Sequence, residues 1–300
     1  MKVFISYCHA QAAWVRGSLE PCLRAAGVDV LIDYRRFTAG IALNDQMNQF
    51  QSEAERQLIV LSEDYVQSEM CRRELKTAIA LDPNFSNGVI LPVRRDNVAM
   101  PFAFKRLNPL YINLVDDGNA EQWEKLLAAC GVSLGTSAPE WLKVRDEAVR
   151  CLQDCRSLNL LTRGRVAWRG LIENLVDESR LDLAEVDLDS GSTSYRQGLI
   201  SVILSALGVP GAVPLPPRDL EHLSINLAGL SRRRLAIRHG DHIAHRPDYG
   251  VDFFAAIRHA IENRNLVLLL QSRAPFGTIM PRNHPLSNMD LHTVELVERV

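Results

Sequence analysis

The stretch that decides the fold is residues 57–81, which read QLIVLSEDYVQSEMCRRELKTAIAL. Gln57–Ser62 is a short apolar run of the kind that forms a strand, and a helix is predicted from about Ser68 to Leu81. The alternation of apolar runs with amphipathic segments continues on both sides of this stretch and predicts a mostly parallel sheet covered on both faces. The further strands are predicted at 3–6, 28–33, 89–93 and 110–114, and the further helices near 14–26, 43–51 and 122–130.

The ends of the predicted strands carry polar side chains. Right-handed crossovers place the loops after parallel strands along one edge of a sheet, where doubly wound folds bind ligands. Ser6 and Tyr7 end the first strand, Asp33 ends the second and Ser62 ends the third. We therefore expect these side chains to meet at a ligand-binding edge.

The chain length and a segment with linker-like composition predict two domains. A chain of 300 residues is longer than one typical domain, and the segment 131–139 (GVSLGTSAP) is the best linker candidate. The second half repeats the alternation of strands and helices, so we expect an α/β domain at 1–134 and a second α/β domain at 140–300. Its strands are predicted at 158–161, 183–188, 235–238, 266–270 and 293–296. Its helices are predicted at about 141–155, 166–176, 195–207 and 251–262.

Composition excludes several classes of protein. The chain has 34 Lys and Arg against 36 Asp and Glu, a balance that argues against nucleic acid or an anionic membrane as the main partner. The run Leu266–Leu270 is too short to cross a bilayer, and the N-terminal apolar stretch is too short for a secretory signal. Six cysteines without CxxC spacing or a His cluster predict reduced thiols in a cytoplasmic protein without a metal site.

Four segments of the first half carry a family resemblance through their order and spacing. They are Phe4–Tyr7 (FISY), Asp33–Gly40 (DYRRFTAG), Val60–Tyr65 (VLSEDY) and Ser68–Leu75 (SEMCRREL). Together they closely resemble the Toll/interleukin-1 receptor (TIR) domain, of the type found in bacteria, over residues 1–130. The resemblance implies a flavodoxin-like, five-stranded parallel sheet in which the loop at 34–41 is the recognition loop.

The resemblance also implies two classes of function. Many members, particularly bacterial ones, cleave NAD⁺ at the nicotinamide–ribose bond, and the glutamate essential for that reaction matches Glu74 by position. NAD⁺ would be the substrate, and no separate cofactor is implied. Other members are adaptors that associate TIR-to-TIR and perform no chemistry.

The residue type at position 74 suits the first class. Cleavage of NAD⁺ expels neutral nicotinamide, so the leaving group needs no general acid, whereas the ribose develops oxocarbenium charge that a carboxylate can stabilise. Water as the nucleophile gives ADP-ribose, and an intramolecular nucleophile gives a cyclic product. The alternative is that Glu74 is a solvated helix residue paired with a surface cation such as Lys76.

Other residues of the motifs have a binding and a structural interpretation. Asp33 could accept hydrogen bonds from a ribose or amide, or cap the loop backbone. Phe37 could stack on a base or pin the loop to the domain, and Gly40 is expected to supply a positive φ for the turn. Cys71 is expected to be a small buried apolar residue rather than a nucleophile.

Two positions depart from the family pattern. Members commonly carry Trp where Met70 stands, and an acidic residue soon after the first-strand motif, where this chain has His9-Ala10-Gln11. An aromatic residue at position 70 would help to hold nicotinamide. Methionine is polarizable and could still pack on an aromatic ring there.

The second domain resembles a reduced P-loop NTPase module. Residues 158–171 have the strand–loop–helix layout of a P-loop, but Arg169, Gly170 and Leu171 stand where a Walker A motif has Gly, Lys and Ser or Thr. The strand before Arg273 looks like the one that precedes a sensor arginine in signalling ATPases. The alternative is a generic α/β domain that binds a partner or senses a signal.

These observations lead to two expectations of function. The first is a cytoplasmic NAD⁺ glycohydrolase or cyclase whose TIR domains are activated by self-association, as in bacterial immune effectors that act against phage. The second is a non-catalytic adaptor that transduces signals through TIR–TIR contacts. In the first, Glu74 is catalytic, and Ser6, Tyr7, Asp33, Phe37, Gly40, Ser62, Met70 and Cys71 contribute to the NAD⁺ site.

Overall fold

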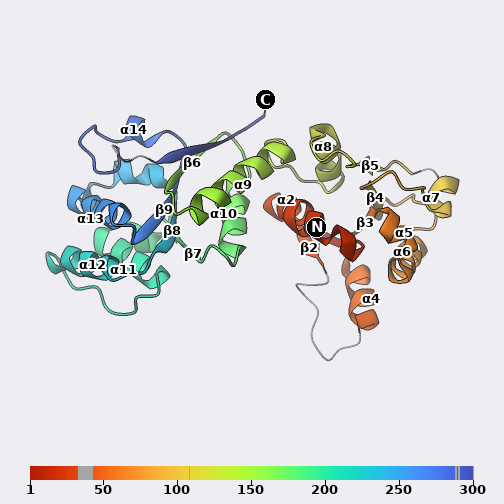
Figure 1. The fold of residues 1–300 in the computed structure, drawn as a ribbon, viewed down its shortest axis with the longest axis horizontal. Helices are drawn as coiled ribbons and strands as arrows, with labels where there is room; N and C mark the ends of the chain where they lie inside the picture. Colours follow the sequence, from red (N-terminus) through yellow and green to blue (C-terminus); the bar gives the residue numbers. More distant parts are fainter. Residues whose placement is uncertain (33–42, 108, 288, 290, 300) are drawn as a thin grey trace. The chain divides into compact units, whose positions relative to one another are not determined.

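The computed structural model describes residues 1–32, 43–107, 109–287, 289 and 291–299 (Figure 1). The predictions for Asp33, Phe37, Gly40 and the loop at 34–41 lie outside these residues. The chain divides into two compact units, Met1–Leu142 and Lys143–Val300. The division falls within helix α9 (Ala138–Gln153), which begins in the predicted linker.

The N-terminal unit contains a parallel sheet of five strands in the order β2-β1-β3-β4-β5. This is the order of flavodoxin-like folds, so the predicted fold of the first half is confirmed. Each strand pairs with its neighbours in parallel register, for example Phe4 with Gln57 and Leu58 with Leu91. The strands are β1 (Lys2–Ser6), β2 (Asp29–Leu31), β3 (Arg56–Leu61), β4 (Ile90–Arg94) and β5 (Ile112–Asn113).

The first crossover is a single helical segment with a π-helical turn in it. A 3₁₀ turn at His9–Gln11 leads into α1 (Ala12–Trp14), the π turn Val15–Leu19 and α2 (Glu20–Ala25). As predicted, Gly27 ends the segment: its φ is +91°, and the next amide, of Val28, donates to the carbonyl of Leu23 at 3.0 Å. The remaining helices of this unit are α4 (Leu43–Glu53), α5 (Glu63–Gln67), α6 (Glu69–Leu81), α7 (Phe102–Leu107) and α8 (Ala120–Ala129).

Serine caps orient the two helices that follow β3. Ser62 accepts a hydrogen bond from the amide of Tyr65 at 3.1 Å at the start of α5, and Ser68 accepts one from the amide of Cys71 at 3.3 Å at the start of α6. Behind the caps, Leu75 of α6 packs into a buried cluster with Tyr65 of α5 and the inner residues of β3 and β4. These caps and contacts place the first turns of α6 beside the carboxyl ends of β1 and β3.

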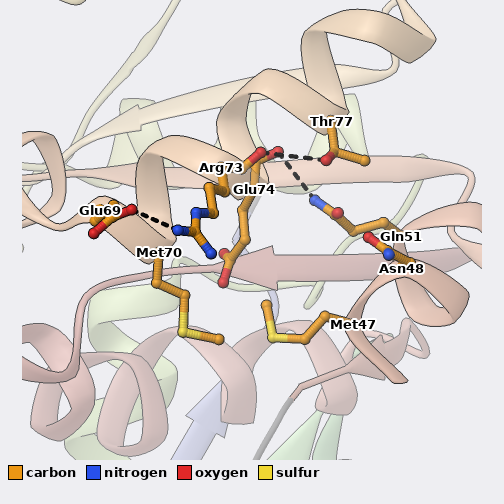
Figure 2. Close-up of a pocket in the computed structure, with 8 residues that line it drawn as sticks. All are labelled: Met47, Asn48, Gln51, Glu69, Met70, Arg73, Glu74 and Thr77. Atoms are coloured by element: carbon orange, nitrogen blue, oxygen red, sulfur yellow. Dashed lines mark hydrogen bonds and ion pairs between the residues drawn. The ribbon is translucent and has the colours of Figure 1, made fainter. Parts of the chain in front are cut away.

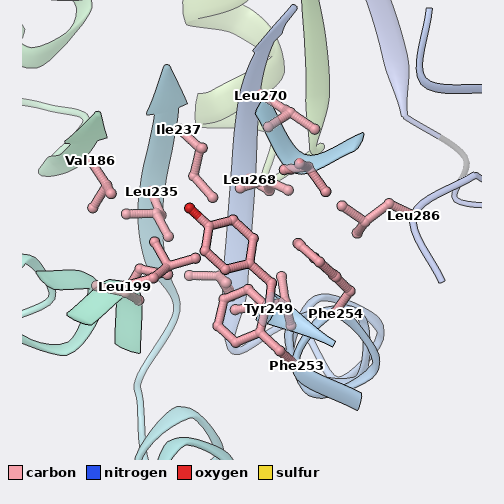
Figure 3. Close-up of a cluster of buried hydrophobic side chains, with 14 of the residues drawn as sticks. Val186, Leu199, Leu235, Ile237, Tyr249, Phe253, Phe254, Leu268, Leu270 and Leu286 are labelled. Carbon is pink, nitrogen blue, oxygen red and sulfur yellow. The ribbon is translucent and has the colours of Figure 1, made fainter. Parts of the chain in front are cut away.

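The C-terminal unit is a second parallel sheet, in the order β10-β6-β9-β8-β7, which confirms the predicted second α/β domain. Tyr249, Phe253 and Phe254 pack on Leu235 and Leu268 of its central strands (Figure 3). The ring centroids of Phe253 and Phe254 lie 4.9 Å apart in an edge-to-face arrangement. The strands are β6 (Leu158–Arg163), β7 (Leu183–Asp187), β8 (Arg233–Arg238), β9 (Leu266–Ser272) and β10 (His292–Val297).

The helices of this unit follow the predicted alternation with two additions, α12 (Arg218–Ala228) and the short α14 (Phe276–Ile279). Helix α12 follows the Pro-rich segment and was not predicted from the sequence. The others are α10 (Trp168–Asp177), α11 (Arg196–Ala206) and α13 (Val251–Glu262). None of the helices in the described parts of the chain is both long and apolar enough to span a bilayer.

Candidate active site

Glu74 lies on the sixth residue of α6, half-buried, at the carboxyl end of β1. Ser6, the last residue of β1, is 1% exposed, and its Oγ donates a hydrogen bond to Oε2 of Glu74. The backbone carbonyl of Glu74 accepts a hydrogen bond from the side-chain amide of Gln51 on α4 at 3.2 Å. Contacts from β1 and α4, which are distant in sequence from α6, therefore hold Glu74 at the carboxyl edge of the sheet.

Tyr65 extends the contact behind Ser6. Its hydroxyl lies 2.8 Å from Oγ of Ser6, and its side chain is completely buried. Burial raises the pKa of Tyr65 well above its usual value, and the negative charge of Glu74 adds to the rise although the hydrogen bond with Ser6 lowers it. The phenol is therefore protonated at any physiological pH.

A cavity of about 470 Å³ opens in front of Glu74. Figure 2 shows the carboxylate of Glu74 reaching down between the side chains of Met70 on α6 and Met47 on α4. At its rim, Arg73 and Glu69 form an ion pair of 2.5 Å, and both side chains are largely exposed. The lining residues are Met47, Asn48, Gln51, Glu69, Met70, Arg73, Glu74 and Thr77.

Three of the predicted site residues that the structure describes, Tyr7, Ser62 and Cys71, are not among the residues that line the cavity. Ser62 is completely buried, and its hydroxyl caps α5. Tyr7 is 7% exposed, and its hydroxyl accepts a hydrogen bond from Arg16 at 3.4 Å. Cys71 is 4% exposed, and its thiol contacts the carbonyl of Tyr7 at 3.8 Å. Of the predicted residues that the structure describes, Glu74 and Met70 line the cavity, and Ser6 contacts Glu74.

The thiol of Cys71 is poorly suited to nucleophilic chemistry. Burial raises its pKa from 9.0 to about 11, and the nearby charges of Glu74 and Cys8 add to the rise although a hydrogen bond to Ser68 lowers it. Because only the thiolate attacks, Cys71 is almost entirely in its unreactive form at neutral pH.

Tyr65 and six of the eight residues that line the cavity, all except Met70 and Glu74, were not anticipated from the sequence. Tyr65 sits in α5, a helix of five residues, which is too short to show a helical period. Met47 and Gln51 lie one turn apart on α4 and reach the site only through the packing of α4 beside α6. Arg73 directly precedes Glu74, and this position in the sequence was the one signal that could have placed it at the site.

No group of three His, Cys, Asp or Glu side chains suited to a metal ion occurs in the part of the chain that the structure describes.

The loop that resembles a P-loop joins β6 to α10 in the C-terminal unit. Gly164 has φ of +82°, and a Cβ at this position would collide with Glu298. The amide of Arg165 donates to Oε2 of Glu298 at 3.0 Å. A carboxylate of the chain therefore accepts from the backbone of this loop, where a P-loop would present its amides to a phosphate.

Comparison with known proteins assigns the N-terminal unit. A family model, described as the TIR domain, matches residues 3–127. Residues 3–127 form a TIR domain. The predicted resemblance is thereby confirmed for this part of the chain.

The curated relatives match a shorter part of the TIR domain. Toll-like receptor 6 of Dasypus novemcinctus is 33% identical to this chain over 72 residues, and Toll-like receptor 6 of Homo sapiens is 32% identical over 72 residues. The match covers 24% of this chain and only 9% of each receptor.

Solved structures show weaker similarities. The TIR domain of the Toll-related receptor TRR-2 from Hydra magnipapillata is 21% identical, with 41% of this chain and 93% of that chain covered at a TM-score of 0.37. The ORC1 protein of Aeropyrum pernix, solved in complex with DNA, is 19% identical, with 52% of this chain and 44% of that chain covered at a TM-score of 0.39. At these TM-scores neither similarity defines a function for this chain.

Proposed function

We propose that the TIR domain cleaves NAD⁺ at the nicotinamide–ribose bond, with Glu74 as the catalytic residue. The observation that carries the proposal is the placement of one half-buried carboxylate, held by Ser6, at the inner end of a cavity at the carboxyl edge of the sheet. NAD⁺ is the substrate, and the reaction needs no further cofactor.

The chemistry needs little more than this carboxylate. As the bond between ribose C1′ and the pyridinium nitrogen breaks, its electron pair goes to the nitrogen, and nicotinamide leaves as a neutral molecule. Positive charge builds on the ribose ring, and the carboxylate of Glu74 stabilises it. Water then adds to C1′ and loses a proton to give ADP-ribose; attack by a nitrogen of the adenine in the same molecule would give a cyclic product instead.

The cavity offers complementary groups for the rest of the substrate. Its volume of about 470 Å³ falls within the usual range of ligand sites. The thioethers of Met47 and Met70 flank Glu74 and can contact the face or edge of nicotinamide, at about 0.3–1.5 kcal/mol for each sulfur–aromatic contact. The guanidinium of Arg73 at the rim can bind the negatively charged pyrophosphate.

We place this activity in the cytoplasm, in an immune or signalling effector whose TIR domains are activated by self-association. None of the six cysteines, all within the described residues, forms a disulfide, which suits a reducing compartment. Assembly would gate the reaction if a neighbouring copy supplied part of the site or held it in its active conformation. The C-terminal unit would control the assembly.

A specific observation favours a second candidate, a TIR adaptor without catalysis. Phe102 is 79% exposed and Leu110 is 88% exposed, both close in sequence to residues that line a small, mostly apolar cavity of about 240 Å³. Exposed apolar surface of this kind is typical of protein interaction sites. Under this alternative, Leu110→Asp would abolish capture of a second TIR domain, and Glu74→Gln would leave capture intact.

The test of the first candidate is release of nicotinamide from NAD⁺. The purified chain is incubated with NAD⁺, alone and clustered on a multivalent tag, and the products are separated by chromatography. The proposal predicts nicotinamide from the wild type and from Glu121→Gln, an exposed control on α8, but none from Glu74→Gln. Equal release by Glu74→Gln, or no release by the wild type even when clustered, would overturn it.

A further inference from the structure

Ser6 has one proton to donate and two neighbours within hydrogen-bond distance. Its Oγ donates to Oε2 of Glu74, and the hydroxyl of Tyr65 lies 2.8 Å from the same oxygen. A hydroxyl donates a single hydrogen bond but accepts through two lone pairs. Because the proton of Ser6 points to Glu74, Tyr65 must be the donor to Ser6. The three groups form a one-directional chain that runs from Tyr65 through Ser6 to Glu74.

The far end of this chain is rigidly held. Tyr65 is completely buried, and its ring packs with Ile59, Leu61 and Leu75 in the cluster beneath α5 and α6. Its backbone amide is fixed by the cap from Ser62 at 3.1 Å. With its pKa raised well above the ordinary value, the phenol keeps its proton and stays a donor. Ser6, which is 1% exposed, connects this fixed point to the half-buried carboxylate.

We propose that Tyr65 and Ser6 are positioning residues that hold Glu74 in one orientation and in its ionised form for the reaction proposed above. The inference rests on that function and assigns the hydroxyl of Ser6 to Glu74 rather than to the ribose of the substrate. Donation from Tyr65 polarises the Ser6 hydroxyl and strengthens its hydrogen bond to the carboxylate. A hydrogen bond to the charged form of an acid favours that form, so the chain keeps Glu74 ready to stabilise positive charge.

The ionisable side chains of α6 that lie close to Glu74 in sequence include Glu69, Cys71 and Arg73. Among the described residues, Cys71 is a neutral thiol with a pKa of about 11. Glu69 and Arg73 form an ion pair with each other at the exposed rim of the cavity. Loss of the hydrogen bond from Ser6 therefore removes a donor to the carboxylate of Glu74.

The first test is a set of single-hydroxyl variants assayed for nicotinamide release across pH. Ser6→Ala is expected to lower kcat about tenfold or more. It should also raise the apparent pKa of the acid limb of the pH–rate profile by about one unit, which corresponds to the same tenfold factor. Tyr65→Phe is expected to lower kcat by a smaller factor, roughly threefold, because the direct contact with Glu74 survives. KM stays near its wild-type value in both, and Ser6→Thr, which keeps a hydroxyl, restores kcat.

The matched control is Tyr249→Phe in the C-terminal unit. Tyr249 is also completely buried and also uses its hydroxyl, which donates to the carbonyl of Thr193. Its loss disturbs folding in a comparable way without touching Glu74. Thermal unfolding of all variants then separates lost stability from lost positioning.

The second test does not depend on activity. The side-chain carboxyl carbon of Glu74 is followed by ¹³C NMR during a pH titration, with Glu74→Gln to assign the signal. The proposal predicts that the pKa of Glu74 rises in Ser6→Ala and, by less, in Tyr65→Phe, and stays unchanged in Tyr249→Phe. An unchanged pKa of Glu74 in both Ser6→Ala and Tyr65→Phe would overturn the inference, even if both variants unfold at a lower temperature than the wild type. If the wild type releases no nicotinamide, the proposed function fails, and the titration still decides whether the chain controls Glu74.

Discussion

The ion pair between Arg73 and Glu69 at the rim of the cavity leads to a prediction for KM: substitution of Arg73 should raise KM for NAD⁺, and substitution of Glu69 should lower it. Arg73 and Glu69 are 67% and 73% exposed and lie one turn apart on α6. Exposed pairs of this kind contribute about 0.3–0.5 kcal/mol, so Arg73 can leave Glu69 at little cost. A charge-assisted hydrogen bond from Arg73 to a phosphate oxygen of NAD⁺ contributes more, about 1.5 kcal/mol at the low end that suits an exposed site.

These magnitudes set the expected kinetics. Arg73→Ala should raise KM for NAD⁺ roughly sixfold, because the phosphate contact exceeds the ion pair it replaces by about 1.1 kcal/mol and 1.4 kcal/mol corresponds to a factor of ten. Glu69→Gln removes the competitor for Arg73 and should lower KM by roughly twofold. Neither variant should change kcat, since the phosphates are remote from the breaking bond and their binding is the same in the ground state and the transition state. The free energy of unfolding should change by less than about 0.5 kcal/mol in either case.

The assay is the initial rate of nicotinamide release over a range of NAD⁺ concentrations, repeated with nicotinamide riboside. The riboside has no phosphate, so both variants should have the wild-type KM for it. An unchanged KM for NAD⁺ in Arg73→Ala, or an equal rise in KM for the riboside, would refute the phosphate-binding role of Arg73.

Three further predictions concern the rest of the molecule. Under native conditions an aromatic disulfide reagent should label Cys8 and Cys155 quickly and the four buried thiols slowly, so rapid labelling of more than two thiols would contradict the described packing. The carboxylate of Asp219 is completely buried and forms an ion pair of 2.8 Å with Arg196. Asp219→Ala should destabilise the C-terminal unit by roughly 3–5 kcal/mol and lower its Tm by roughly 10 °C, because it leaves the charge of Arg196 without this partner. A shift of Tm below about 2 °C in calorimetry would count against this. Although burial acts to raise it, backbone and side-chain hydrogen bonds and nearby cations lower the pKa of Asp187. The contribution of Asp187 to the free energy of unfolding should therefore be complete above about pH 5 and disappear as the pH falls through the lowered pKa. In denaturant titrations at acid pH, the free energies of unfolding of Asp187→Asn and the wild type should converge. A difference between them that persists below about pH 2 would contradict the assignment.

The sheet and most helices could be predicted because their signals are local. Helix α13 starts and ends at the predicted residues, Val251 and Glu262, where Gly250 with φ of +74° precedes it. Four of the described helices were not predicted, for reasons that are also local. The five residues of α5, the six of α7 and the four of α14 are too few to establish a period, and α12 follows a Pro-rich segment that favours loop.

The candidate site was predictable only in part. Position 74 came from a family resemblance, since a glutamate beside two arginines on a helix has no signal of its own. The contacts of Glu74 depend on tertiary packing: Ser6 and Tyr65 are separated by 59 residues, and nothing in either local pattern shows that they meet. Ser62 was expected to face a ligand because it ends a strand, but its hydroxyl satisfies the first turn of α5 instead.

The most direct test of the central claim is a single-turnover reaction of the clustered chain with NAD⁺ labelled in the nicotinamide ring. With enzyme in excess, the account predicts that the wild type converts the label to free nicotinamide in one exponential phase. Glu74→Gln, which keeps the shape of the side chain and removes its charge, should bind NAD⁺ with similar affinity and release no label on the same timescale. Conversion by Glu74→Gln at the rate of the wild type would show that another group carries the reaction and would contradict the account.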